Sequence, residues 1–88
     1  MFIVQYKLKR AKDFHNEWEK ARERFPQGCH LIQAISTKEG GMCFAIFDIA
    51  THKALHDFHK KFLDQHSEWK IFEIDEYHLE GEKWRKAQ

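Results

Sequence analysis

The sequence predicts an α+β fold in which a four-stranded antiparallel sheet carries two helices on one of its faces. Three features of the chain support this prediction. Apolar patterning gives strand, helix and strand twice in succession, in the order β-α-β-β-α-β. One strand, Gly41–Ala50, is apolar on both sides and therefore belongs in the middle of the sheet. Each helix has a single apolar stripe and can cover only one side of a sheet.

Four segments have the composition and period of strands. The first alternates so that Phe2, Val4, Tyr6 and Leu8 share one face. In the second, Leu31, Gln33 and Ile35 are expected to face one way, and two glycines close the turn that follows. The third runs from Met42 to Phe47 with no polar residue, which indicates that both of its faces are covered. The expected ranges are Phe2–Lys9, Cys29–Thr37, Gly41–Ala50 and Trp69–Leu79.

Two segments have the period of amphipathic helices. The first begins near Asp13, a suitable N-cap or first-turn acid, and ends at Pro26 and Gly28. Its apolar stripe consists of Phe14, Trp18, Ala21 and Phe25. The second helix is expected to start after Thr51 as its N-cap and to continue to about His66, with the stripe Ala54, Leu55, Phe58 and Phe62.

With right-handed crossovers, this element order gives the ferredoxin-like sheet order 4-1-3-2, with both helices on one face. We expect a single domain over residues 1–80, followed by a short polar tail, 81–88, that carries Trp84. The other face of the sheet carries apolar residues from every strand and needs a cover. A second copy of the chain is the simplest cover, so the sequence predicts a homodimer packed sheet face against sheet face.

Charge and composition argue against several classes of partner. The chain has 88 residues, with 15 Lys and Arg against 14 Asp and Glu, a net charge of +1. This balance gives no electrostatic case for binding nucleic acid or a membrane. No segment approaches the roughly 20 apolar residues of a membrane span, and the start of the chain does not resemble a signal peptide. We expect a cytoplasmic protein in which Cys29 and Cys43 are free, buried thiols.

Polar residues on otherwise apolar faces mark the candidate ligand pocket. Tyr6 follows Phe2 and Val4 on its strand, Gln33 lies between Leu31 and Ile35, and Glu73 follows Trp69 and Ile71. His59 lies at the edge of the apolar stripe of the second helix. We interpret His59 and Glu73 as candidate proton-handling groups, and Tyr6 and Gln33 as residues that orient a ligand. The favoured alternative is that Glu73 and Asp75 lie on an edge strand and face water, or pair with Lys residues of a partner chain.

The chain has seven histidines, and four of them are expected on the second helix, at positions 52, 56, 59 and 66. His52 and His56 have the four-residue spacing of a metal pair, and His59 follows one turn later. No Cys or carboxylate completes a four-ligand set, so the favoured interpretation is that these rings lie at the edge of the core. We expect no metal and no cofactor, and keep His52, His56 and His59 as the alternative metal site.

An RNA-binding sheet is a further alternative, because RNA-recognition motifs share this element order. The segment Gly41–Phe47 resembles their third-strand signature, with Phe44 and Phe47 in register. Met42 replaces the first stacking ring, however, and Glu39-Gly40 replaces the basic residues that precede it. We regard this function as less favoured.

Four motifs of the chain carry a resemblance to known proteins: Phe25-Pro26-Gln27-Gly28, Leu31-Ile32, the run Gly41–Asp48, and Ala54-Leu55 followed by Phe58. They resemble motifs of the dimeric α+β barrel superfamily and, within it, of a family of small bacterial proteins of unknown function. The likeness covers about residues 2–76, although Ile74-Asp75 stands where that family usually has Pro-Val.

By resemblance, relatives in this superfamily include cofactor-free monooxygenases that act on aromatic polyketides, lactone isomerases, haem-binding degraders and members without known activity. Their ligands typically lie between sheet and helices. A haem enzyme would need an axial histidine, and no motif selects one here. The resemblance therefore implies a homodimer that binds a small hydrophobic or aromatic ligand, without settling whether it is an enzyme. The alternative is a non-catalytic protein-interaction or regulatory module.

Overall fold

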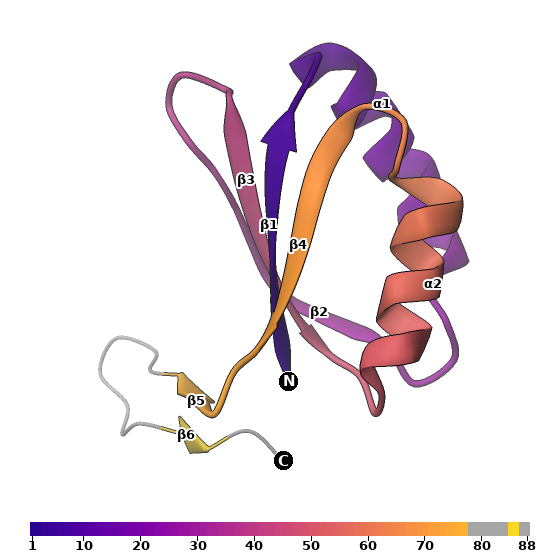
Figure 1. Cartoon of the computed structure of the whole chain (residues 1–88), viewed down its shortest axis with the longest axis vertical. Coiled ribbons are helices and arrows are strands. Elements are labelled where there is room, and N and C mark those ends of the chain that lie inside the picture. Colours follow the sequence, from indigo (N-terminus) through magenta and orange to yellow (C-terminus); the bar gives the residue numbers. More distant parts are fainter. Residues whose placement is uncertain (78–84, 87–88) are drawn as a thin grey trace.

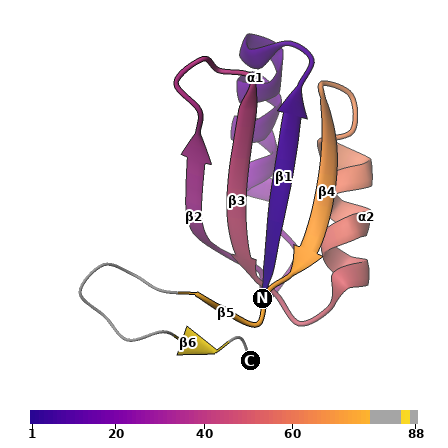
Figure 2. The ribbon, with the colours of Figure 1, turned by 60° about the vertical axis from the view of Figure 1, so that its left-hand side comes forward.

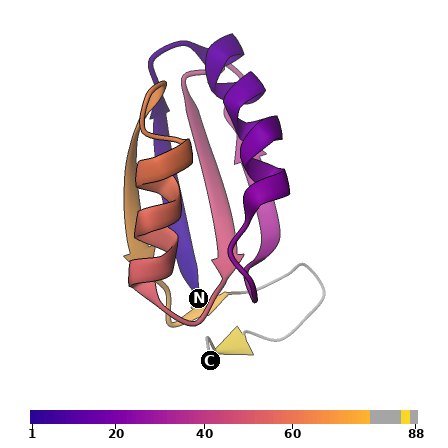
Figure 3. The same cartoon turned by 90° about the vertical axis from the view of Figure 1, so that its right-hand side faces the viewer.

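The computed structural model describes residues 1–77 and 85–86. It shows the predicted ferredoxin-like α+β fold, with the sheet order β2-β3-β1-β4 seen in Figure 2. Both helices lie on one side of this sheet (Figures 1 and 3). The strands are β1 (Phe2–Leu8), β2 (His30–Ser36), β3 (Met42–Asp48) and β4 (Ser67–Glu73), and the helices are α1 (Ala11–Ala21) and α2 (His52–Phe62). A short 3₁₀ turn, η1 (Arg22–Arg24), extends α1, and β5 (Glu76–Tyr77) pairs with β6 (Arg85–Lys86) as a separate hairpin.

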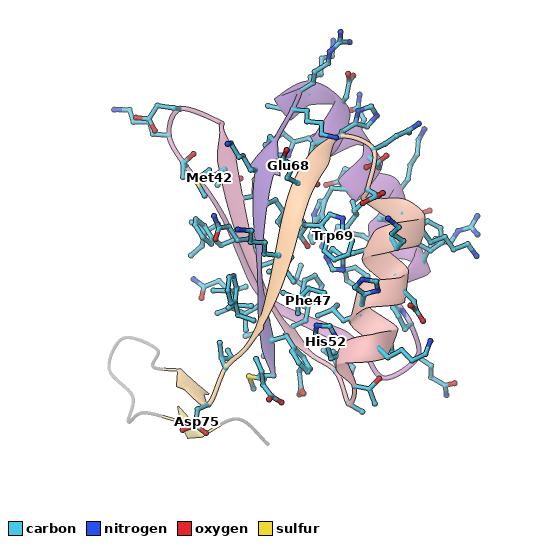
Figure 4. All side chains as sticks on the ribbon, in the orientation of Figure 1. Met42, Phe47, His52, Glu68, Trp69 and Asp75 are labelled. Atoms are coloured by element: carbon cyan, nitrogen blue, oxygen red, sulfur yellow. The ribbon has the colours of Figure 1, made fainter. Side chains whose placement is uncertain are left out.

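The central strands β1 and β3 separate the two faces of the sheet. Residues that lie opposite each other in an antiparallel pair share a face, and Val4 pairs with Ala45 while Ile3 pairs with Ile46. On the helix side, Val4 and Phe47 are completely buried. Figure 4 shows Phe47 in the layer between sheet and helices and Met42 on the opposite side. The prediction that β3 is a central strand with two apolar faces is confirmed.

The core is one cluster between the sheet and the helices. It combines one face of β1 and β3 with the apolar stripes of α1 and α2. Its buried apolar residues are Phe2, Val4, Tyr6, Phe14, Ala21, Cys29, Cys43, Ala45, Phe47, Ile49, Leu55, Phe58 and Leu63. Both cysteines are free and buried, as predicted, and Cys43 lies opposite Ser36.

The predicted facing of β2 is wrong in its first half. The register shifts between Leu31 and Gln33, so Leu31 pairs with Phe47 on the helix side while Gln33 pairs with Ile46 on the other side. The extra residue of such a bulge reverses the alternation of all residues beyond it. Leu31 therefore packs against the core, and Gln33 and Ile35 point away from it.

Strands β1, β2 and β3 end within two residues of the predicted bounds, and the ends of α1, α2 and β4 differ from them as well. Helix α1 begins two residues before Asp13, which lies in its first turn, and the side chain of the N-cap residue Arg10 makes no capping hydrogen bond. Helix α2 stops at Phe62, because the fully buried Leu63 leaves the helix and its carbonyl accepts a hydrogen bond from the Ser67 hydroxyl.

Strand β4 spans Ser67–Glu73 rather than Trp69–Leu79, because its partner β1 offers pairing positions only from Leu8 back to Phe2. Leu79 and Trp84 lie outside the described residues. Of the two turn glycines, Gly40 has a positive φ. The predicted helix end at Pro26 and Gly28 is wrong, because α1 ends at Ala21 and η1 at Arg24. Gly28 takes its positive φ in the turn before β2, where the Cys29 N–H donates to the Pro26 carbonyl. No helix among the described residues is long and apolar enough to cross a membrane.

The N-cap of α2 gives a first test of this fold. The Thr51 hydroxyl accepts a hydrogen bond from the Ala54 N–H at 3.2 Å. Removing it in Thr51→Ala should lower the free energy of unfolding by about 1 kcal/mol, measured by urea denaturation. Thr51→Ser keeps the hydroxyl and should lose much less. Equal losses in the two variants would show that the cap contributes nothing.

Candidate functional site

The most distinctive polar feature of the interior is a hydrogen bond between Tyr6 of β1 and His59 of α2. The Tyr6 hydroxyl lies 2.5 Å from His59 Nε2, and His59 Nδ1 lies 2.8 Å from the Leu55 carbonyl oxygen. A carbonyl can only accept, so Nδ1 carries the hydrogen and Nε2 accepts from Tyr6. The exposed fractions of the two side chains are 1% and 0%. Every polar atom of the pair therefore has a partner inside the protein.

Burial keeps both members of the pair uncharged. It raises the pKa of Tyr6 well above 10.0, and nearby Cys43 and Cys29 raise it further. Burial lowers the pKa of His59 from 6.5 to about 4, although the hydrogen bond to Leu55 opposes this. At neutral pH the pair is thus a phenol and a neutral imidazole. Such a pair can hold two elements together without a buried charge.

Aromatic rings surround the pair. The His59 ring stacks on Tyr6 with a centroid distance of 5.5 Å, and it contacts the ring edges or faces of Phe47, Phe58 and Trp69 at 5.3 to 5.6 Å. On its other side Tyr6 meets Phe14 and Trp18 of α1. This packing fixes the Tyr6 ring between the two helices, with Trp69 in the same layer (Figure 4).

A small hollow lies on the α1 side of Tyr6. It has a volume of about 60 Å³ and is bounded by α1, β1 and the β2–β3 pair. Two adjacent cross-strand pairs form its floor, Ala34 with Ala45 and Ser36 with Cys43. Because all four side chains are small, they leave space under the helix. The Ser36 hydroxyl and the Cys43 thiol are 3.2 Å apart and give this floor a polar edge.

Rings of α1 form the opposite wall of the hollow. Phe14, His15 and Trp18 come from about one turn of the helix and face the floor together with Tyr6. Ala34 and Ser36 are exposed, although they lie on the helix side of the sheet. The hollow therefore opens to solvent along β2, beyond the reach of α1. An apolar group of limited size can enter it from that side.

The structure brings together two of the four predicted pocket residues. Tyr6 and His59 are hydrogen-bonded to each other. Gln33 is exposed on the opposite face of the sheet, because the bulge in β2 turns it away from the helices. Glu73 is on the helix side, opposite Phe2, but it is exposed at the end of the edge strand. The predicted acid–base partners His59 and Glu73 thus lie apart.

The three histidines of the alternative metal site do not converge. His52 and His56 are exposed on α2 with their rings stacked at 6.1 Å, while His59 points into the core and uses both ring nitrogens for other hydrogen bonds. His66 lies after the end of α2, in the connection to β4. In the part of the chain that the structure describes, no group of three or more His, Cys, Asp or Glu side chains could hold a metal ion.

Apart from Tyr6, sequence reasoning did not identify the residues around the hollow. A signal for them exists, because Ala34 and Ser36 on one strand and Cys43 and Ala45 on the next are small residues at alternate positions. Only the register shows that the two pairs are side by side. The sequence also did not identify Phe14 and Trp18 as the wall of a hollow, because they have the spacing of ordinary core residues on a helix.

Comparisons with known proteins add no relative from which a role could be transferred. No protein-family model matches the chain, and no curated protein or solved structure matches it. The resemblance to dimeric α+β barrels therefore stays a prediction. The function has to be argued from the geometry of the fold and of the hollow.

The Tyr6–His59 pair predicts a specific pH dependence of stability. The pKa of His59 is 6.5 in the unfolded chain and about 4 in the folded chain, so the unfolded state binds the proton first as the pH falls. The contribution of His59 to the free energy of unfolding is fully present above pH 6.5. It is lost as the pH falls to 4, and the loss amounts to about 3 kcal/mol. Urea denaturation across this range should show the loss.

The control for this prediction is on the same helix. In His59→Gln the side chain cannot take up a proton. Between pH 6.5 and pH 4 this variant should therefore lose about 3 kcal/mol less of its free energy of unfolding than the wild-type protein loses. His52→Gln, at an exposed position and not among the groups that shift the pKa of His59, should keep the wild-type slope. If the stability of His59→Gln and of the wild-type protein depends equally on pH, the assignment of His59 as a buried neutral imidazole is wrong.

Proposed function

We propose that this protein is a homodimeric binding protein that accommodates a small, apolar or aromatic ligand between α1 and the β2–β3 pair. The hollow carries this proposal, because it combines a floor of small side chains with the rings of Phe14, Trp18 and Tyr6. Ligand sites are typically concave and largely apolar, with a few polar groups that orient the ligand. Here Ser36 and Cys43 supply these polar groups.

The size of the hollow limits what it can hold. A cavity of about 150 Å³ encloses a benzene ring, whereas this hollow has about 60 Å³. It can take a methyl or short alkyl group, or the edge of a ring, while the rest of the ligand extends along β2 toward solvent. A monosubstituted or alkylated aromatic compound has this shape.

The chemistry of the pair favours binding over acid–base catalysis. A general base works best when its pKa is close to the working pH, but the pKa of His59 is about 4. His59 is also closed to solvent and has no free ring nitrogen. The cofactor-free oxygenases and isomerases of the resembling superfamily would need a more accessible proton acceptor. We therefore assign the pair the role of holding Tyr6 at the wall of the hollow.

The sheet face away from the helices supports the dimer. The register places six apolar side chains from four strands on this face: Ile3, Ile35, Met42, Phe44, Ile46 and Phe72. Ile35 and Phe72 are exposed to 51% and 48%. Contiguous apolar surface of this kind is unusual on a monomer and marks an interaction site. Both helices lie on the other side of the sheet (Figure 1).

The charges on the same face do not oppose a contact between two copies. Lys7 lies opposite Glu68 near one end of the face, Lys70 lies in the middle of β4 opposite Gln5, and Asp48 lies at the other end opposite His30. The two lysines and the two acidic residues balance, so this face carries no excess of one charge that two copies would have to bring together.

A charge placed in the apolar face tests the dimer. Sedimentation of the wild-type protein at micromolar concentration should give twice the mass of one chain, and Phe72→Glu should give a single chain, because a carboxylate cannot be buried unpaired in the contact. Gln65→Glu adds the same charge in the α2–β4 connection and should leave the dimer intact. A monomeric wild-type protein would contradict the homodimer and would favour the non-catalytic module, in which this face binds a different protein.

Filling the hollow tests the ligand site. We expect p-cresol, a ring with one methyl group, to shift the NMR signals of Ala34, Ser36, Cys43 and the Trp18 indole. Ala34→Leu places a larger side chain in the hollow and should weaken this binding at least about tenfold, a loss of 1.4 kcal/mol. Ala50→Leu, an equal change outside the hollow, should leave it unchanged. Binding that survives Ala34→Leu would overturn the site.

A further inference from the structure

A second feature of α1 is an ion pair that ties it to a distant part of the chain. Glu17 Oε2 lies 3.9 Å from His66 Nε2, in the connection between α2 and β4. Among the described side chains, every other ion pair joins residues no more than four positions apart. Glu17 and His66 are exposed to only 19% and 32%. This pair is therefore the long-range electrostatic contact of the described fold.

The His66 half of the contact is anchored. Its carbonyl oxygen accepts a hydrogen bond from the Lys9 N–H at 2.9 Å. Three residues earlier, Leu63 is fully buried, and its carbonyl accepts from the Ser67 hydroxyl at 3.0 Å. The connection is thus held at both ends by the core and the sheet. The pair consequently acts on α1, the element that Glu17 belongs to.

The Glu17 carboxylate lacks a hydrogen-bond donor for one of its two oxygens when it is ionised. Its other oxygen, Oε1, is buried and has no hydrogen-bond partner. Burial raises the pKa of Glu17, Asp64 raises it further, and His66 lowers it. A buried carboxylate oxygen without a donor costs free energy. One added proton on the carboxyl group removes the charge and with it this cost, whereas a proton on the imidazole would give only the other oxygen, Oε2, a charged partner.

The other charged groups around Glu17 do not replace His66. Lys9, Lys60, Lys61 and Asp64 line the groove of about 570 Å³ in which Glu17 lies. Lys60 is paired with Asp64 at 3.5 Å, and no described lysine nitrogen lies within ion-pair distance of Glu17. On α1 itself, Asp13 and Lys20 lie about one turn away on either side. His66 is thus the basic side chain that lies within ion-pair distance of this carboxyl group.

We propose that Glu17 and His66 form a proton-controlled latch that holds α1 on the sheet in mildly acidic solution and loosens it as the pH rises. Because α1 carries Phe14, His15 and Trp18, the latch would also set the wall of the hollow. This last step rests on the proposed function. The latch itself depends only on the contact between the helix and the α2–β4 connection.

The sign of the effect follows from the direction of the shift. The pKa of Glu17 is raised in the folded state above its ordinary value of 4.5. Its contribution is fully present below that value and is lost as the pH rises through the raised pKa. His59 acts in the opposite direction between pH 6.5 and 4. A comparison of variants that differ only at Glu17 cancels the contribution of His59.

Amide hydrogen exchange resolved by NMR tests the latch on the intact protein. After correction for intrinsic exchange, the opening constant of the α1 amides should rise several-fold from pH 5 to pH 8, relative to the amides of β1 and β3. Glu17→Gln cannot ionise and should abolish this rise. Glu19→Gln removes an exposed carboxylate from the same helix, paired only with the nearby Arg22, and should behave as the wild type.

A second variant covers the other half of the pair. His66→Gln removes the ring that contacts Glu17, so the α1 amides of this variant should open more than those of the wild type at pH 5. A flat pH profile in the wild type, or a profile that survives in Glu17→Gln, would overturn the latch.

Binding of p-cresol separates the latch from the ligand site. If α1 opens with rising pH but p-cresol binds nowhere near the hollow, the latch is supported and the proposed function fails. If p-cresol binds in the hollow while the opening of α1 is independent of pH, the latch is overturned and the ligand site stands.

Discussion

The constraint behind this structure is that β3 is apolar on both faces, whereas the two helices can cover only one face of the sheet. Burial of apolar surface contributes about 25 cal/mol per Å², so a strand with two apolar faces is stable only in the centre of a covered sheet. The helix layer buries Cys43, Ala45 and Phe47 of this strand. Met42, Phe44 and Ile46 on the other face are left half-buried in a single chain. The proposed dimer follows from this imbalance.

The Tyr6–His59 pair is a polar contact placed in an otherwise aromatic layer. Two hydrogen bonds satisfy the imidazole, and burial keeps it neutral, so the pair avoids the cost of a buried charge. An apolar pair in the same place could fill the space but would not define one register between β1 and α2. The hydrogen bond does define it, because its geometry is directional. We infer that the pair contributes to the precision of the fold more than to chemistry.

Helix α1 connects the proposed site with its proposed control. One side of the helix supplies the rings of Phe14 and Trp18 to the hollow, and the neighbouring Glu17 contacts the α2–β4 connection. The residues under the helix on β2 and β3 are small, so a hollow of about 60 Å³ remains between them and α1. An element with incomplete packing on one side is one that a single ion pair can influence.

The sequence by itself determined the elements and most of their faces. Alternation placed Phe2, Val4 and Tyr6 on one face of β1, the unbroken apolar run identified β3 as central, and Thr51 marked the start of α2. These signals are local, because side-chain period and capping depend on a few neighbouring residues.

Tertiary structure alone decided where polar groups meet. The bulge after Leu31 turned Gln33 away from the helices, the length of β1 ended β4 at Glu73, and the burial of Leu63 ended α2 before His66. Of the four expected pocket residues, only Tyr6 and His59 came together, and the small residues of the hollow became adjacent only through strand register. Register and packing depend on residues far apart in the chain, which a local pattern does not encode.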